Sequence, residues 1–367
     1  MKAFYRPTKA VIDLKAIENN LAAFKKHSPE TEQIAVVKAD AYGHGVVEVA
    51  KRAVESGVKF LAVATPDEAL YLREQGFDVK LLVLGATPAA FIPVAQERQI
   101  AVAAISLEWL RMAEEAIDPS LPALKLHLKV DTGMRRIGVA YEQAEEAIRF
   151  IRSQPFAFEG LFTHFATADE KEGGLFRQQV RQMAEIIHQV GDPDVLVHVS
   201  NSAAALMHPD LAYDAVRIGI SMYGIAPSPY VEQEMPFRLE PAMSLETEIV
   251  QVKKLKAGEA VSYGATYVSE EDEWIATLPI GYADGMLRGL QGQEVLVRGH
   301  RAPVIGRICM DQCMIRIPEE MPAGEKVQLI GKQENAEIRI NEWAEKLGTI
   351  PYEIPCNLTK RVPRVYR

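Results

Sequence analysis

The sequence has few cysteines and no long apolar run, and each absence excludes a class of protein. The three cysteines, Cys309, Cys313 and Cys356, are an odd number without the spacing of a disulfide framework, which is typical of a reducing compartment. No histidine cluster accompanies Cys309 and Cys313, so we predict no metal site. No apolar stretch is long enough to cross a bilayer, and residues 1–13 lack the apolar segment of a signal peptide. We therefore expect a cytoplasmic protein.

The sequence also lacks clusters of positive charge. It has 41 Lys and Arg residues against 50 Asp and Glu residues, a formal net charge of −9. A nucleic-acid-binding surface needs a basic patch to neutralise phosphates, so we expect neither a nucleic-acid nor a membrane partner. The 367 residues, 48% of them hydrophobic, are enough for two domains or for one large barrel with an appendage.

Short apolar runs alternate with longer helical stretches over residues 1–235, and this alternation predicts a parallel sheet. There are eight runs, the number that closes a (β/α)8 barrel of the TIM type. They lie at residues 34–38, 60–64, 80–84, 100–104, 124–130, 159–164, 195–200 and 215–219. Helices are expected over residues 14–26, between Thr65 as cap and Gly76 as terminator, and over 175–190.

From about residue 236 the pattern changes to β-rich segments separated by Gly and Pro turns. One helix is expected near residues 340–347. We therefore predict an α/β protein with two domains, a (β/α)8 barrel at residues 1–235 and a mostly β C-terminal domain at residues 236–367.

In a barrel of this kind, the chemistry occurs at the carboxyl ends of the strands. Polar residues at or just after those ends include Lys38, Tyr42, Lys129, Arg136, His164, Asn201, Ser202 and Arg217. Each alone has an ordinary structural explanation, since a lysine at a strand end is usually solvated and a lone histidine is usually structural. Several polar strand ends at one mouth indicate a site, because burying such groups costs free energy unless they are paired.

The loops after the last two strands are the usual phosphate site of such barrels. Ser202 begins an expected helix, whose N–H groups favour an anion, and Gly219 allows close approach of the backbone. A phosphate there and Lys38 across the mouth indicate a phosphorylated ligand that forms an imine. Pyridoxal 5'-phosphate (PLP) fits, and so does a sugar phosphate in an aldolase with a Schiff-base lysine. The residues alone leave both open.

Eight motifs, in order along nearly the whole chain, resemble those of alanine racemases. These PLP-dependent isomerases interconvert L-alanine and D-alanine and supply D-alanine for the peptidoglycan of the cell wall. The motifs are AVVKADAYGHG, KVDTGMRRIG, THFATAD, SNSAA, VRIGISMYG, VSYGATY, PIGYADG and GRICMDQCMIR. The resemblance implies pyridoxal 5'-phosphate as cofactor, alanine as substrate, and a homodimer with composite active sites.

The resemblance also implies catalytic and cofactor-binding residues. Lys38 would form the internal aldimine with PLP and take the proton from D-alanine, and Tyr263 would be the opposite base and take it from L-alanine. Arg217 would face the pyridine nitrogen, and His164 would support Arg217. The residues expected to hold the phosphate are Tyr42, Ser202, Gly219, Ile220 and Tyr352.

Further roles concern the substrate and the entrance. Arg136 would contact the phenolic oxygen of the cofactor and the substrate carboxylate, to which Met310 would donate its backbone N–H. Lys129 would be carbamylated and orient Arg136. Tyr282, with Tyr352, would narrow the entrance. By the same resemblance, the second subunit would supply Tyr263, Tyr282 and Met310.

Two positions depart from the common family pattern, and three alternatives remain to be weighed. Arg135 stands where many members have glycine, and Asp40 where asparagine is also common. Related decarboxylases place a carboxylate at the pyridine nitrogen, where this chain has Arg217. A non-catalytic PLP-binding homeostasis protein would lack the β domain. A racemase of broader specificity stays open, because the sequence does not give the shape of the substrate pocket.

Overall fold

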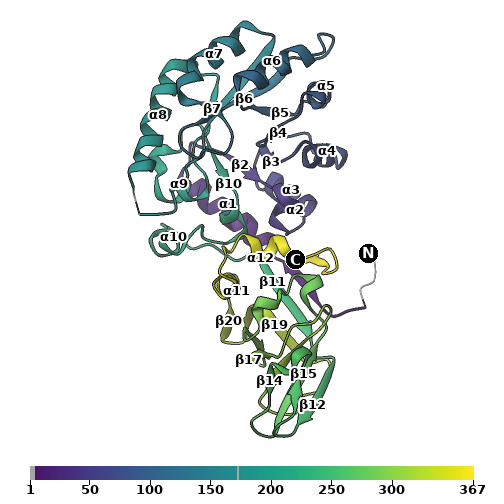
Figure 1. The fold of residues 1–367 in the computed structure, drawn as a ribbon. Coiled ribbons are helices and arrows are strands. Elements are labelled where there is room, and N and C mark those ends of the chain that lie inside the picture. The colour runs from purple at the N-terminus through teal and green to yellow at the C-terminus, as the bar shows by residue number, and fades with distance from the viewer. Residues whose placement is uncertain (1–4, 172) are drawn as a thin grey trace. The chain divides into compact units, whose positions relative to one another are not determined.

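The computed structural model describes residues 5–171 and 173–367 (Figure 1). The chain divides into two compact units, which are described one at a time. The barrel unit contains Ala16–Ala41 and Val46–Glu240, and the β unit contains the residues up to Lys15, Tyr42–Gly45 and Pro241–Arg367. Residues 5–15, which the sequence analysis placed with the barrel, thus contact the β unit. A division into two domains near residue 235 stays a prediction.

Eight parallel strands form the near-closed barrel, in the order β10-β2-β3-β4-β5-β6-β8-β9, and β7 pairs with β6. The eight are β2 (Glu32–Val36), β3 (Phe60–Val63), β4 (Lys80–Val83), β5 (Ala101–Ala104), β6 (Leu124–Asp131), β8 (Phe156–Phe162), β9 (Leu196–Val197) and β10 (Ala215–Ile218), and the additional strand is β7 (Val139–Ala140). Each of the eight predicted strands is present. Two backbone hydrogen bonds link the segments of β9 and β10, the two ends of this order: Asp214 N donates to Val197 O (3.2 Å) and Arg217 N donates to Ser200 O (3.0 Å).

The barrel strands are apolar throughout because both of their faces are buried. Phe60–Val63 and Ala101–Ala104 are buried at every position. In Figure 1 the helices of this unit surround the strands. They are α1 (Leu14–His27), α2 (Lys38–Tyr42), α3 (Val46–Glu55), α4 (Pro66–Glu74), α5 (Ile92–Glu97), α6 (Leu107–Ala116), α7 (Ala144–Ser153), α8 (Gly174–Val190), α9 (Ser202–Met207) and α10 (Pro229–Glu234). Short 3-10 turns are η1 (Ala89–Phe91), η2 (Tyr141–Gln143), η3 (Pro209–Leu211) and η4 (Ile220–Tyr223).

The predicted helix ends are confirmed by their caps. The Asp13 carboxylate accepts from Lys15 N (3.0 Å) at the start of α1. Thr65 and Glu68 form a capping box at the start of α4, with Pro66 in the first turn. Within the described ranges, no helix is long and apolar enough to span a membrane.

The β unit contains a sheet in the order β12-β15-β18-β17-β16-β19-β11-β1-β21, with β20 beside β19, and a separate pair β13-β14. The strands are β1 (Lys9–Ile12), β11 (Met243–Glu248), β12 (Gln251–Leu255), β13 (Ala260–Val261), β14 (Tyr267–Val268), β15 (Glu273–Leu278), β16 (Glu294–Val297), β17 (His300–Ile305), β18 (Cys313–Ile317), β19 (Lys326–Gln333), β20 (Ala336–Ile338) and β21 (Arg364–Tyr366). Its helices and turns are η5 (Tyr263–Ala265), η6 (Tyr282–Asp284), η7 (Arg288–Leu290), α11 (Ile340–Leu347) and α12 (Glu353–Asn357). The mostly β C-terminal region and its helix at 340–347 are as predicted.

Candidate active site

Lys38 lies at the beginning of a left-handed turn that directly follows β2. The sequence analysis ended the strand on Lys38, but β2 ends at Val36 and Lys38 begins α2. Ala39, Asp40, Ala41 and Tyr42 have φ of 52°, 53°, 53° and 51°. A residue with a Cβ atom pays roughly 1–2 kcal/mol for this conformation, and such strain gathers at functional sites.

Hydrogen bonds at both ends hold this left-handed turn. Ala39 N donates to Glu68 Oε1 (2.7 Å), and Val46 N donates to Asp40 Oδ1 (2.8 Å). Ala41 N donates back to Val37 O (2.9 Å). The side chain of Lys38 therefore starts from a backbone that its neighbours fix, which is what a reactive amine requires.

Four cationic side chains, Lys38 among them, act on one another at the mouth of the barrel. Burial, together with the charges of Arg217, Arg136 and Lys38, lowers the pKa of Lys129 to about 8, whereas the carboxylate of Asp131 opposes this shift. The structure thus brings these four cations together, with one acid that acts on Lys129. The cluster favours the binding of anions.

Arg217 is buried at the centre of this cluster and is held by carbonyl and imidazole acceptors. It donates to Thr163 O (2.8 Å), to Val199 O (3.0 Å) and to the carbonyl of His198. It also lies 3.1 Å from His198 Nδ1 and 3.4 Å from His164 Nδ1. Burial lowers the pKa of the guanidinium to about 9, so the group keeps its charge at pH 7.

The histidines around Arg217 are neutral, and their tautomers follow from its chemistry. A guanidinium only donates, so both Nδ1 atoms that face Arg217 accept. His198 then carries its proton on Nε2 and donates to His127 Nδ1 (2.8 Å). Burial lowers the pKa of His127 to about 3, and burial with the neighbouring cations holds the pKa of His164 well below its usual range.

Ser202, Gly219 and Ile220 lie together after the last two strands of the barrel. Gly219 N donates to Ser202 Oγ (2.9 Å), so the Ser202 hydroxyl keeps its own hydrogen to give to a ligand. Asn201 caps α9 by accepting from Ala204 N (3.0 Å). Ile220 is buried and begins η4. That Ser202, Gly219 and Ile220 hold a phosphate stays a prediction.

Tyr42 and Tyr352, the other residues expected at the phosphate, lie beside each other in the β unit. Their ring centroids are 6.3 Å apart. Burial raises the pKa of Tyr42, and the neighbouring Tyr352 and Cys356 raise it further, so Tyr42 keeps a hydroxyl that can donate. That these tyrosines and the Ser202 group contact one phosphate stays a prediction.

The remaining predicted site residues lie on turns of the β unit. Tyr263 in η5, Met310 and Tyr282 are 72%, 52% and 38% exposed. Tyr282 N donates to Cys309 O (3.0 Å) and Ala283 N to Met310 O (3.0 Å), so the Tyr282 and Met310 turns form one hydrogen-bonded group.

The buried carboxylate of Asp284 holds the Tyr282 turn in place. Asp284 accepts from Gly281 N (3.0 Å) and pairs with Arg6 (2.9 Å) and Arg361 (3.3 Å). Arg361 also pairs with Asp311 (2.7 Å), which follows Met310. Two arginines thus tie both turns to one buried acid.

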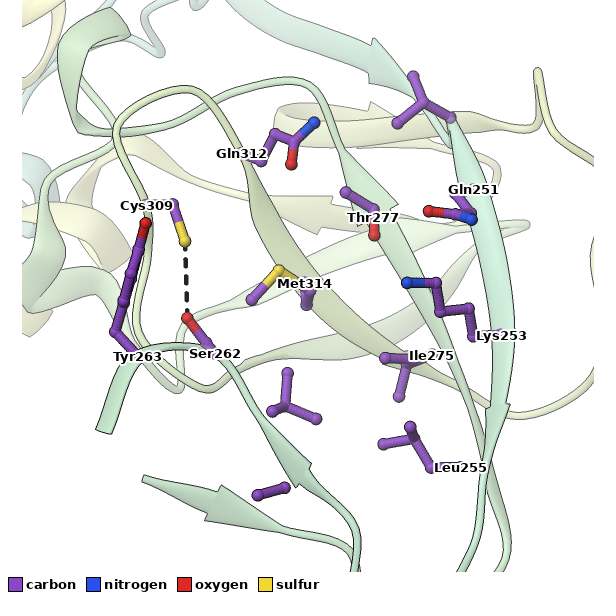
Figure 2. A pocket seen from close by; sticks show the side chains of 13 residues that line it. Gln251, Lys253, Leu255, Ser262, Tyr263, Ile275, Thr277, Cys309, Gln312 and Met314 are labelled. Carbon is purple, nitrogen blue, oxygen red and sulfur yellow. Dashed lines mark hydrogen bonds between the residues drawn. The ribbon is translucent and has the colours of Figure 1, made fainter. Parts of the chain in front are cut away.

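Tyr263 lies at the rim of a pocket of about 680 Å³ in the β unit (Figure 2). The wall of the pocket contains residues of β12, β15 and β18, among them Lys253, Ile275 and Met314. Figure 2 shows Tyr263 beside Cys309, whose Sγ lies 3.5 Å from Ser262 Oγ. The hydroxyl of Tyr263 therefore stands at an open surface of this unit.

Two family models match the chain in succession. Residues 12–227 match the alanine racemase N-terminal domain, and residues 242–366 match the alanine racemase C-terminal domain. The chain belongs to the alanine racemase family. Its members are isomerases, and their reaction is the interconversion of L-alanine and D-alanine.

Relatives cover the chain from end to end. The alanine racemase of Geobacillus kaustophilus is 50% identical over 100% of this chain and 96% of its own length. The crystal structure of alanine racemase from E. faecalis has a TM-score of 0.96 and 44% identity, and covers 100% of this chain and 99% of that chain. A histidine racemase from Leuconostoc mesenteroides has a TM-score of 0.93 and 32% identity over 100% of this chain and 99% of that chain.

Arg135 adopts a backbone conformation that favours glycine. Its φ is 56°, which a residue with a Cβ atom adopts only at a cost. The Asp131 carboxylate accepts from Gly133 N (2.9 Å) and Arg135 N (3.0 Å), which folds the loop that carries Arg136.

The sequence analysis did not assign His198 or Glu68 to the alanine racemase site. His198 stands in the apolar run VLVHVS, and a histidine within such a run is the sequence feature that could have indicated its place at the site. For Glu68 the sequence pattern indicates only a capping box. Its bond to Ala39 could not be predicted, because the two residues are distant in the sequence. In the described part of the chain, no group of three or more His, Cys, Asp or Glu residues could hold a metal ion.

Proposed function

We propose that this chain interconverts L-alanine and D-alanine by a PLP-dependent, two-base reaction in which Lys38 and Tyr263 are the bases. The observation that carries the proposal is the cluster of Lys38, Lys129, Arg136 and Arg217 at the mouth of the barrel. PLP carries a phosphate and a phenolic oxygen, and alanine carries a carboxylate. A site with this excess of cations fits those anions.

The residues present also fit the separate parts of PLP. When bound, the cofactor supplies an electron-withdrawing ring that stabilises negative charge at Cα of the substrate. Ser202, Gly219 and Ile220, with Tyr42 and Tyr352, would hold its phosphate.

Arg217 would face the ring nitrogen with His164 supporting it. Since Arg217 only donates, it would leave that nitrogen unprotonated, which keeps the negative charge at Cα and favours return of the proton there.

Racemisation requires a proton to leave one face of Cα and another to arrive on the opposite face. One base could do this only by moving or by turning the substrate. Lys38 and Tyr263, on opposite faces, would each hold a proton in turn. Arg136 and the backbone N–H of Met310 would bind the substrate carboxylate and keep Cα between the two bases.

We further propose that Lys129 is carbamylated. A pKa of about 8 leaves an appreciable fraction of the amine neutral near pH 7, and a neutral amine adds to CO2 with loss of one proton to form an anionic carbamate. The carbamate would lie near Arg136 and Arg217 and replace like-charge repulsion with attraction. It would thereby orient Arg136 toward the substrate.

The exposure of Tyr263 and Met310 supports a homodimer in which the second subunit completes each site. A base that is 72% exposed would exchange protons with water rather than with one substrate. Covering by a partner subunit would remove that exchange, with Tyr282 and Tyr352 narrowing the entrance. D-alanine made in this way would serve peptidoglycan synthesis. The cytoplasmic location stays a prediction from the sequence.

The likeness to a histidine racemase supports one alternative, a racemase that also accepts larger amino acids. The test is to purify the protein and a Lys38→Ala variant, record visible absorbance, and follow D-alanine formed from L-alanine. A band of covalently held PLP with D-alanine formation, both lost in the variant, is the expected result. A band with faster turnover of histidine than of alanine would favour the alternative, and no band would refute the cofactor assignment.

A further inference from the structure

The carboxylate of Glu68 makes two more hydrogen bonds than a helix cap requires. It lies in the first turn of α4, where Thr65 Oγ1 accepts from Glu68 N (3.3 Å). Its Oε2 accepts from Thr65 N (3.3 Å), which completes the cap, and also from Ala64 N (2.8 Å), which precedes the cap. Its Oε1 accepts from Ala39 N (2.7 Å), and this bond has no part in capping α4.

The bond to Ala39 acts on Lys38 because the two residues share a peptide plane. The N–H of Ala39 belongs to the plane that begins at the Cα–C bond of Lys38, so fixing the N–H fixes that plane. It thereby sets the direction in which the Cα–Cβ bond of Lys38 points. Strand β2, which precedes Lys38, pairs in parallel with β3, which precedes Glu68, so the bond joins two neighbouring strand ends.

The turn needs such an anchor because its backbone conformation is unfavourable. Ala39, Asp40 and Ala41 have φ and ψ close to 50° although they carry Cβ atoms. Without tertiary contacts these residues would return to negative φ. The carboxylates of Glu68 and Asp40 accept from amides on either side, at Ala39 and Val46, and oppose that return.

We propose that Glu68 is a positioning residue for Lys38, which fixes the peptide plane after the lysine and stabilises the left-handed turn that follows it. The inference rests on the proposed function, since it gives Glu68 a role in placing the proposed base. A carboxylate suits the position because all three amides that face it are donors. A glutamine would turn one NH2 group toward a donor.

The test compares Glu68→Ala and Glu68→Gln with Thr65→Ala. Thr65→Ala is the matched control, because it removes the side-chain cap of α4 and leaves the bond to Ala39. The first measurement is hydrogen exchange at Ala39 in the cofactor-free protein. The second is kcat and KM for L-alanine in the PLP-loaded protein. Glu68→Gln serves where Glu68→Ala does not fold.

We expect both Glu68 variants to speed exchange at Ala39 by about ten-fold, the factor expected from losing a bond to a charged acceptor. We expect kcat to fall on the order of 10- to 100-fold, as for a misplaced catalytic group, with KM changed less. Thr65→Ala should leave exchange at Ala39 unchanged and kcat within about two-fold of the wild type.

Three results would overturn the role of Glu68. They are unchanged exchange at Ala39, unchanged kcat despite faster exchange, and equal effects of the Glu68 variants and Thr65→Ala. The wild type separates this failure from that of the proposed function. A wild type that forms no D-alanine overturns the proposed function, whereas an active wild type with equally active Glu68 variants overturns only the positioning role.

Discussion

Replacing Arg135 by glycine should stabilise the folded chain, whereas replacing it by alanine should not. Arg135 adopts a φ of 56°, which costs a residue with a Cβ atom roughly 1–2 kcal/mol. Glycine adopts it without that cost but loses about 0.5–1 kcal/mol through the greater freedom of the unfolded chain. Alanine keeps the Cβ cost. All three residues keep the backbone bond to Asp131.

The difference between the two variants isolates the backbone term. Arg135→Gly should have a free energy of unfolding about 0.5–1 kcal/mol above that of Arg135→Ala. The side chain is exposed, so its charge contributes little in either comparison. Urea denaturation of the cofactor-free proteins, with equal m-values, measures the difference. Equal midpoints, or a more stable alanine variant, would refute the strain at Arg135.

Three further predictions concern buried groups. The pKa of Lys129 is lowered to about 8, so the folded state binds fewer protons than the unfolded state between about pH 8 and 10.5. The free energy of unfolding, measured without CO2, should therefore rise by up to about 3 kcal/mol as the pH rises through that window. The Lys129→Gln variant should not show this rise. Asp284→Asn should lower stability by about 1–2 kcal/mol, because it removes the charge that two partly exposed arginines pair with. The exposed Asp311→Asn should change stability by less than about 1 kcal/mol in the same thermal scan. Gly160→Ala should cost about 1–3 kcal/mol, because its Cβ would lie 2.1 Å from His127 Nδ1; an unchanged melting temperature would contradict this packing.

The barrel could be predicted because its strands are buried on both faces. Runs such as FLAV at β3 and AVAA at β5 are apolar at every position, and a cap, a proline or a glycine punctuates the helices between them. The C-terminal sheet was predicted only as β-rich. Strand β1 pairs with β11 and β21, and no local pattern indicates partners so distant in the sequence.

The site was predictable where residue types determine the chemistry, and not where tertiary contacts determine the backbone. Lys38 at a strand end was visible in the sequence. The left-handed turn after it was not, because Ala39 and Ala41 have no local preference for positive φ and the anchoring carboxylate of Glu68 comes from another segment. The hydrogen-bonded chain from Arg217 through His198 to His127 could not be predicted either, because it forms only when neighbouring strands pack together.

The pairing of β1 also sets an order of events during protein synthesis. Barrel strands β3 to β6 pair with strands that are close in the sequence, but β1 at Lys9–Ile12 pairs with β11 at Met243–Glu248. At translation rates of about 5–20 residues per second, β1 waits roughly 10–50 s for that partner. The nascent chain therefore carries an exposed strand edge while the barrel folds, and a chaperone that binds extended apolar segments would find its target at the start of the chain.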